Sequence, residues 1–340
     1  MLNFILNPLI KIELSEFPDS FWNKRLMNNE FGAYCQTVEF AKYVELRLKF
    51  QPKFIKFFTE SDELVGQLLL FQYNKGQKQL GEKIGRGKLF SQVVKLLRFF
   101  PKLYYWSHGP IIFNLNYTSD IFDLLGNYLL KNNFKFHCTS HTLNSNFTFS
   151  NSFNFKSKDN HTFIINLQDD LDQIFKNTEK KSVQKNIKRS KERGVKITQI
   201  NSHDDILVYY NILKKFRKDN DLPPYCYDDV VTGFKITKEA GVKGFLAWHD
   251  DLPVGGIIIT TFNGYINESG IARTQKDYDE KLYSLELLRW KIIEWGIENK
   301  CKYYDLSGVE INNNDPKKLG IYRNKKKWGG KLVAYSSWFN

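Results

Sequence analysis

The chain lacks the cysteine and histidine patterns of a disulfide framework or a zinc site. Four cysteines lie far apart and form no CxxC pair: Cys35, Cys138, Cys226 and Cys301. His137 and His141 are four residues apart, but the stretch around them is rich in Asn, Thr and Ser and shows no helical pattern. Isolated thiols are typical of a reducing compartment, and a zinc site needs a tighter ligand set. The sequence therefore predicts no disulfide and no metal.

Long apolar runs are also missing. No stretch of about 18 apolar residues, the length that a membrane-spanning helix needs, occurs in the sequence. The first residues carry no basic start, and Asn7 and Pro8 interrupt their apolar character. We therefore expect a cytoplasmic protein without a transmembrane segment, and peripheral contact with the inner face of the membrane stays open.

Motifs for covalent or nucleotide chemistry are absent as well. The sequence shows no Ser-His-Asp spacing, nucleophile elbow, Walker loop or Rossmann fingerprint. Covalent catalysis is therefore not supported, and no bound cofactor is predicted. Direct transfer, in which a positioned amine attacks an activated ester, remains.

The charge balance points to an anionic partner. The 340 residues include 50 Lys and Arg against 37 Asp and Glu, which gives a net charge of +13. Such an excess favours nucleic acid, an acidic membrane surface or a phosphorylated small molecule, although a general Lys-rich and Asn-rich bias explains it equally well. The length suggests two domains of about 150 residues each.

Strand and helix patterns alternate along the chain, which predicts an α/β (α+β) fold. In the first half we expect a helix within 31–50, strands at 54–59 and 64–73, helices at 90–100 and 121–132, and a strand at 104–113. The aromatic alternation at 147–155 predicts an edge strand. In the second half we expect strands at 242–249, 252–262, 265–272 and 302–307, and a helix at 284–299.

Two hairpins in different halves resemble each other. The segments SDELVGQLLLFQY and HDDLPVGGIIITTF each place an acidic turn before an apolar strand that contains Val-Gly or Pro-Val-Gly. Their separation of roughly 190 residues predicts one architectural unit used twice, and hence two related lobes.

The densest positive cluster is segment 176–195. On a helix, Lys185, Lys188 and Arg189 lie on one face by the i, i+4 rule, and Gly194 ends the helix. Such a face can bind phosphates. A solvated helix is the alternative.

A second cluster stands near the end of the chain, where Tyr322 and Trp328 flank four cations within 323–327. These residues are suited to an anionic substrate, with aromatic rings that stack on a base or sugar. A lysine buried among aromatic rings is also suited to stabilising charge at a reacting acyl group. A solvated tail is the alternative.

Four stretches together resemble the FemABX family of aminoacyl-tRNA-dependent peptidyltransferases. They are Tyr34-Cys-Gln-Thr37; Gly109-Pro110; Lys185-Asn-Ile-Lys-Arg-Ser-Lys-Glu-Arg-Gly-Val195; and Tyr304-Asp-Leu-Ser-Gly-Val309 with Gly320-Ile-Tyr-Arg-Asn-Lys325 and Trp328-Gly329. The last stretch is similar to "Y-D-L-x-G-(I/V)" followed by "G-(L/I)-Y-x-F-K-x-x-F-G" and is the most specific.

The resemblance implies two GNAT-like lobes, each a mixed, largely antiparallel sheet flanked by helices. We expect them at 1–155 and 156–340, with the C-terminal motif returning to the cleft. Lys325 corresponds to the family lysine that stabilises the reacting centre. Asn324 departs from the family pattern, which has Phe at this position. Lys185 and Lys188 stand where Arg occurs in the family, so the bidentate contacts of Arg with phosphate are lost.

These points predict the site residues. Lys325 and Asp305 are the expected catalytic residues, with Asp305 either orienting Lys325, accepting a proton from the attacking amine, or only capping its loop. The expected substrate-binding residues are Lys185, Lys188, Arg189, Tyr304, Tyr322, Arg323 and Trp328.

The predicted reaction is transfer of an aminoacyl group, carried by aminoacyl-tRNA, to an amine of a phosphorylated cell-envelope precursor of the peptidoglycan type. One alternative is a CoA-dependent N-acyltransferase acting on an envelope sugar. The loop Gly85-Arg-Gly87 matches the CoA-binding loop of GNAT enzymes only weakly, because Glu82 stands at its first position. The other alternative is a non-catalytic protein that binds polyanions.

Overall fold

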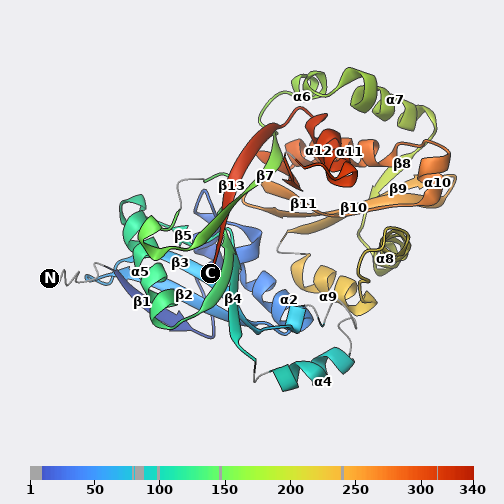
Figure 1. Cartoon of the computed structure of the whole chain (residues 1–340). Helices are drawn as coiled ribbons and strands as arrows, with labels where there is room; N and C mark the ends of the chain where they lie inside the picture. Colours follow the sequence, from blue (N-terminus) through green and yellow to red (C-terminus); the bar gives the residue numbers. More distant parts are fainter. Residues whose placement is uncertain are drawn as a thin grey trace. The chain divides into compact units, whose positions relative to one another are not determined.

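The structure is a computed structural model that describes residues 10–78, 80, 88–97, 100–144, 148–238, 241–311 and 313–340. Its contacts divide the chain into two compact units (Figure 1). The first unit comprises the described residues of 1–79 and 88–159 together with 334–340, and the second comprises those of 80–87 and 160–333. The predicted domain boundary between 155 and 156 stays a prediction.

The first unit is built on a mixed sheet with the strand order β1-β2-β3-β4-β6-β13. Neighbouring strands are antiparallel except for β4 and β6, which are parallel and joined through helix α5 (Thr118–Lys131). A short strand, β5, pairs with β3. The strands are β1 (Ile10–Ser15), β2 (Gln51–Thr59), β3 (Leu64–Asn74), β4 (Lys102–Ser107), β5 (Ile111–Ile112), β6 (Lys135–Thr139) and β13 (Lys331–Phe339).

The second unit repeats this pattern in the strand order β8-β9-β10-β11-β12-β7. The pairs are again antiparallel except for one, β11 and β12, which are parallel and joined through helix α11 (Ser284–Glu298). The strands are β7 (Lys156–Asn166), β8 (Lys196–Gln199), β9 (Val242–His249), β10 (Leu252–Phe262), β11 (Tyr265–Arg273) and β12 (Tyr303–Val309). The shared order confirms the prediction of two related lobes with mixed, largely antiparallel sheets.

Helices cover both faces of the second unit's sheet. Gly255 of β10 lies against Leu288 of α11, whereas the next residue, Gly256, lies against Tyr209 of helix α8 (His203–Asp219). Because successive residues of a strand point to opposite faces, α11 and α8 lie on opposite sides of the sheet (Figure 1). The unit's other helices are α6 (Leu171–Asn177), the π-helical turn η5 (Lys180–Gln184), α7 (Lys185–Glu192), α9 (Tyr227–Thr237), α10 (Gln275–Asp279) and α12 (Pro316–Lys326).

Helices also pack on the sheet of the first unit. Helix α5 packs against β1, and α2 packs against β2. Besides α5, the described helical segments of this unit include α1 (Trp22–Met27), η1 (Tyr34–Gln36), α2 (Val38–Leu48), α4 (Lys88–Leu96), η3 (Leu115–Tyr117) and η4 (Asn151–Phe153). Within the described residues, no helix combines the length and the apolar character needed to cross a bilayer.

Each unit has its own apolar core. In the second unit, Leu288, Ile292 and Ile293 of α11 are fully buried against the sheet. In the first unit, Ile55 and Leu125 are equally buried in a separate cluster. Burial of a Leu or Ile side chain contributes about 1.5–3 kcal/mol, so these clusters account for much of the stability of each unit.

The segment Tyr34-Cys-Gln-Thr37 has a structural role in the first unit. The buried amide of Gln36 donates to the carbonyls of Leu69 (3.1 Å) and Ser107 (2.8 Å), and its oxygen accepts from the Leu69 N–H at 2.7 Å. Gln36 thus links β3 to the end of β4, immediately before the Gly109-Pro110 peptide bond, which is cis. Thr37 accepts from the N–H of Phe40 and caps helix α2.

The predicted edge strand at 147–155 is wrong. Ser150 accepts from the N–H of Ser152, η4 follows, and Asn154 adopts a left-handed conformation with φ of 52°. These local turns prevent an extended strand, and Phe149 is buried in the core of the first unit instead. Phe147 and the loop Gly85-Arg-Gly87 lie outside the described residues.

We expect the contact between α8 and the sheet to be sensitive to a single methyl group. A Cβ at Gly256 lies 2.8 Å from a ring carbon of the buried Tyr209. Gly256→Ala is therefore expected to lower the free energy of unfolding by about 1–3 kcal/mol in urea titrations.

Gly320→Ala is the matched control, because nothing lies within 4 Å of that Cβ and the residue is inside α12. It is expected to leave the free energy of unfolding unchanged or to raise it by up to about 1 kcal/mol. Equal effects of the two substitutions would contradict the described packing of α8.

Candidate functional site

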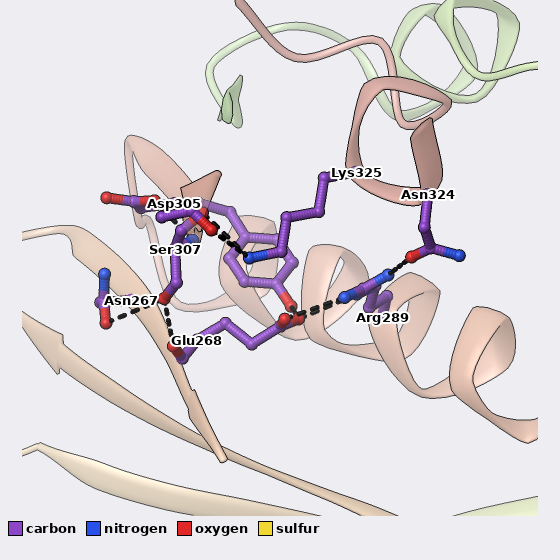
Figure 2. A network of polar contacts seen from close by, with 9 residues as sticks. Asn267, Glu268, Arg289, Asp305, Ser307, Asn324 and Lys325 are labelled. Carbon is purple, nitrogen blue, oxygen red and sulfur yellow. Dashed lines mark hydrogen bonds and ion pairs between the residues drawn. The ribbon is translucent and has the colours of Figure 1, made fainter. Parts of the chain in front are cut away.

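The side chain of Lys325 meets a bulge in strand β12. Between Asp305 and Gly308 the register with β7 shifts, and Ser307 adopts a left-handed conformation with φ of 66°. A bulge of this kind changes the direction in which the neighbouring backbone N–H and C=O groups point. The Lys325 ammonium donates to the carbonyls of Ser307 and Gly308, both at 3.0 Å (Figure 2).

This bulge lies where β11 and β12 separate. The two strands pair only over Tyr265–Asn267 and Tyr303–Asp305, so Glu268 is the first residue of β11 beyond the paired part. The Ser307 hydroxyl donates to the Glu268 carbonyl across this opening. Buried polar side chains, rather than a continued ladder of backbone hydrogen bonds, therefore connect the strands here.

Glu268 and Arg289 form an ion pair in this opening. The Arg289 guanidinium donates through Nε to Oε2 at 2.8 Å and through Nη2 to Oε1 at 2.9 Å, and the side chains are 2% and 3% exposed. Tyr304 donates its hydroxyl to the same carboxylate at 2.8 Å. A third guanidinium nitrogen, Nη1, donates to the Asn324 side-chain oxygen at 2.7 Å (Figure 2).

The pair stays charged despite its burial. Burial by itself raises the pKa of Glu268, but the charge and hydrogen bonds of Arg289, with the charge of Lys325, hold that pKa below its usual value. Burial likewise opposes the charge on Arg289, yet Glu268 raises the pKa of Arg289 above its ordinary value. A two-bond fork between guanidinium and carboxylate is the geometry that best offsets the cost of removing both ions from water.

Asp305 is surrounded by donors. Its Oδ2 accepts from the hydroxyl of Tyr265 at 2.5 Å, and its Oδ1 accepts from Thr162 and from the Ser307 N–H, the latter at 2.7 Å. Burial raises the pKa of Asp305, although these donors and Lys325 act in the opposite direction. The bond to the Ser307 N–H fixes the bulge that carries the carbonyl acceptors of Lys325.

Lys325 retains one N–H for another partner. Only 9% of the residue is exposed, and burial lowers its pKa below the ordinary value while the charges of Glu268 and Asp305 raise it. An ammonium has three donors, and two of them are used by the Ser307 and Gly308 carbonyls. Among the described residues no third acceptor is hydrogen-bonded to it, so one N–H is available to a ligand.

The other predicted residues near Lys325 have different environments. Tyr304 and Trp328 are 0% and 1% exposed and belong to the core of the second unit, not to an open surface. Tyr322 is half-buried against Phe163, with 5.4 Å between ring centroids, and Arg323 is exposed. The structure thus brings Lys325, Asp305 and Tyr304 together in one network and leaves Arg323 at the surface.

The predicted phosphate-binding residues lie on α7, which packs against α11. Lys185 and Lys188 are exposed. Arg189 is half-buried, and its Nη1 is 3.5 Å from the Tyr283 hydroxyl, with the guanidinium 5.9 Å from the ring centroid. Arg189 therefore helps to dock α7 onto the start of α11, while the two lysines face solvent.

The fold of this chain resembles that of solved structures, although neither a protein-family model nor a curated protein matches its sequence. Among solved structures, the crystal structure of FemX superposes with a TM-score of 0.73 at 10% identity, over 95% of this chain and 96% of that chain. The chain has a FemX-like fold.

Two further structures share this FemX-like fold less closely. The structure of L-PGS from Bacillus licheniformis has a TM-score of 0.56 at 10% identity, over 96% of this chain and 93% of that chain. The C-terminal domain of a putative lysylphosphatidylglycerol synthetase from Agrobacterium fabrum has a TM-score of 0.54 at 8% identity, over 93% and 92%. These matches confirm the FemABX-like fold that the sequence motifs predicted.

The sequence motifs point to Lys325 and Asp305 but not to the ion pair that lies beside them. Glu268 and Arg289 are single charged residues within otherwise regular secondary structure, and no spacing links them along the chain. The sequence of α11, SLELLRWKIIEWGIE, is apolar on most sides of the helix, and this pattern could have pointed to Arg289. An arginine within such a helix is expected to be buried and therefore paired.

We expect Arg289→Met to be strongly destabilising because it leaves the Glu268 carboxylate buried without its counter-ion. The expected loss in the free energy of unfolding is about 3–5 kcal/mol in urea titrations. The double variant Glu268→Leu with Arg289→Met removes both charges and is expected to lose less than Arg289→Met alone.

Lys318→Met is the matched control, because it breaks the exposed ion pair with Glu310 and is expected to cost about 1 kcal/mol or less. Glu268→Leu alone completes the cycle. If the double variant loses as much as Glu268→Leu and Arg289→Met added together, the pair is not coupled in the way its geometry indicates.

Proposed function

We propose that the protein is an acyltransferase that moves an aminoacyl group from aminoacyl-tRNA to an amine of a phosphorylated cell-envelope precursor. The observation that carries this proposal is the buried Lys325 ammonium, which keeps one N–H available at the bulge of β12 in a FemX-like fold. The fold alone is compatible with several acyl donors, so the residues of the site have to carry the chemistry.

In the proposed reaction the acceptor amine attacks the carbonyl carbon of the aminoacyl ester. A C–N bond forms and the C–O bond of the ester breaks. The amine gives up one proton, and the ribose oxygen of the tRNA takes up one proton as it leaves as a hydroxyl. Negative charge develops on the carbonyl oxygen during the attack. The available N–H of Lys325 donates to this oxygen, and a fixed cation shielded from water is most effective there.

Asp305 supports this role through the backbone. Its carboxylate holds the Ser307 N–H, and the Ser307 and Gly308 carbonyls in turn hold Lys325. We therefore propose that Asp305 acts mainly as a positioning residue. Its acceptance of the proton from the attacking amine stays a prediction.

Exposed cations supply the proposed contacts with anionic groups. Lys185 and Lys188 on α7 and Arg323 on α12 are all accessible to solvent and belong to a chain with a net charge of +13. Phosphates of the tRNA or of the precursor are the proposed ligands. One structural neighbour is titled a putative lysylphosphatidylglycerol synthetase, so a phospholipid headgroup, with a hydroxyl in place of the amine, is an alternative acceptor worth testing.

We expect Lys325→Met to lower the rate of transfer by about 10²- to 10³-fold, because it removes the donor to the developing oxyanion while preserving much of the side-chain volume. The assay supplies charged tRNA and acyl-CoA in parallel, with a UDP-linked muropeptide as the amine acceptor and, in a separate arm, phosphatidylglycerol vesicles as a hydroxyl acceptor. Lys317→Met, an exposed position in the first turn of α12, is the control and is expected to retain the native rate.

The two donor arms separate the proposal from its rivals. Transfer from acyl-CoA but not from charged tRNA would replace the proposed donor with CoA. Absence of transfer from either donor, together with salt-dependent binding of any polyanion, would identify a binding protein instead. If Lys325→Met transfers the acyl group at the native rate, Lys325 takes no part in the reaction.

A further inference from the structure

Helix α12, which carries Lys325, has little apolar surface of its own. Lys325 is the one buried residue of this helix, at 9% exposure, and Ile321 is 43% exposed. Tyr322 provides a partial apolar contact with Phe163. Lys325 is also next to the last residue of the helix, and helix ends are where local opening is easiest. Trp328, just beyond the helix, is buried in the core and anchors the chain there, and a polar contact adds to this anchoring within the last turn itself.

Asn324 supplies that contact. Its side-chain oxygen accepts from Nη1 of Arg289 at 2.7 Å, whereas the other two nitrogens of the guanidinium, Nε and Nη2, donate to Glu268. Because the guanidinium is planar and rigid, its two hydrogen bonds to Glu268 fix the direction in which Nη1 points. The Arg289 guanidinium also lies 5.9 Å from the ring centroid of Trp328, just beyond the end of α12. Arg289 thus contacts the chain on both sides of Lys325.

We propose that Asn324 and Arg289 are positioning residues for Lys325, an inference that rests on the proposed catalytic role of that lysine. Arg289, locked onto Glu268, holds the last turn of α12 through Asn324. This contact sets where the Lys325 ammonium meets the Ser307 and Gly308 carbonyls and therefore where its remaining N–H points (Figure 2). Neither residue needs to touch the substrate to affect the reaction.

The same contact explains why Asn at position 324 is compatible with a working site. The motif that this segment resembles has Phe there, and a phenyl ring has no oxygen to accept a hydrogen bond from a buried guanidinium. With Phe at 324, Nη1 of Arg289 would lose its partner, and an unsatisfied buried donor is costly. Asn324 and Arg289 are therefore a matched pair in this chain.

The accessibility of Lys325 tests the inference without any turnover. Native protein is treated with a limiting amount of acetic anhydride, and the modification of Lys325 is measured by mass spectrometry relative to the exposed Lys317 of the same helix. Asn324→Leu is expected to increase the relative rate at Lys325 several-fold to about tenfold, because one hydrogen bond less lowers the free energy of local opening. Asn324→Asp keeps an acceptor oxygen and is expected to restore protection.

Asn314→Leu is the matched control, since it makes the same change at an exposed position before α12 and is expected to leave the modification rate unchanged. Unchanged modification of Lys325 in Asn324→Leu would overturn the inference, as would an equal increase in Asn314→Leu.

The transfer assay adds a second readout. For Asn324→Leu we expect kcat to fall by about 10- to 100-fold with little change in KM, because the substrate still binds but meets a misplaced ammonium. If the wild-type protein transfers no acyl group but labelling of Lys325 still increases in Asn324→Leu, the proposed function fails and the positioning role stands. If transfer occurs and kcat is the same in Asn324→Leu and wild type, the positioning role fails and the proposed function stands.

Discussion

The ion pair between Glu268 and Arg289 is the interaction on which the site depends. It joins four elements of the second unit, because Glu268 comes from β11, Arg289 from α11, and their further partners Tyr304 and Asn324 from β12 and α12. Removing two ions from water is costly unless nearly every donor and acceptor finds a partner. Here the two-bond fork, the tyrosine hydroxyl and the asparagine oxygen meet that requirement. The same contacts fix the helix that carries Lys325.

The opening that this pair occupies follows from the strand pairing. Parallel pairing of β11 and β12 ends after Asn267 and Asp305, and the bulge at Ser307 then turns two carbonyls toward Lys325. A regular ladder at this point would use those carbonyls for hydrogen bonds between strands. The separation of the strands therefore frees the two carbonyls that hold the Lys325 ammonium. Because these carbonyls use two of its three N–H groups, one N–H remains for a ligand.

Regular elements with strong periodicity were predictable from the sequence. The strands Val242–His249 and Leu252–Phe262 have the predicted bounds, since an acidic turn separates two apolar runs, and Asn263-Gly264 marks the next turn. The edge strand at 147–155 was wrong because Ser and Asn side chains bond to their local backbone there and outweigh the aromatic alternation. Lys325 was predicted as a site residue because a motif points to it. The ion pair of Glu268 and Arg289 was missed because tertiary contacts alone bring these two residues together.

The protonation state of Lys325 tests the central claim most directly. In protein labelled with ¹⁵N-lysine, NMR detects an ammonium group whose hydrogens exchange slowly, and Lys325→Met assigns the signal. We expect a protected ammonium at neutral pH that loses its proton as the pH rises through a pKa below the ordinary 10.5, because burial lowers that pKa. A neutral amine at pH 7, or an ammonium that exchanges as rapidly as those of exposed lysines, would contradict an ammonium held at the β12 bulge for charge stabilisation.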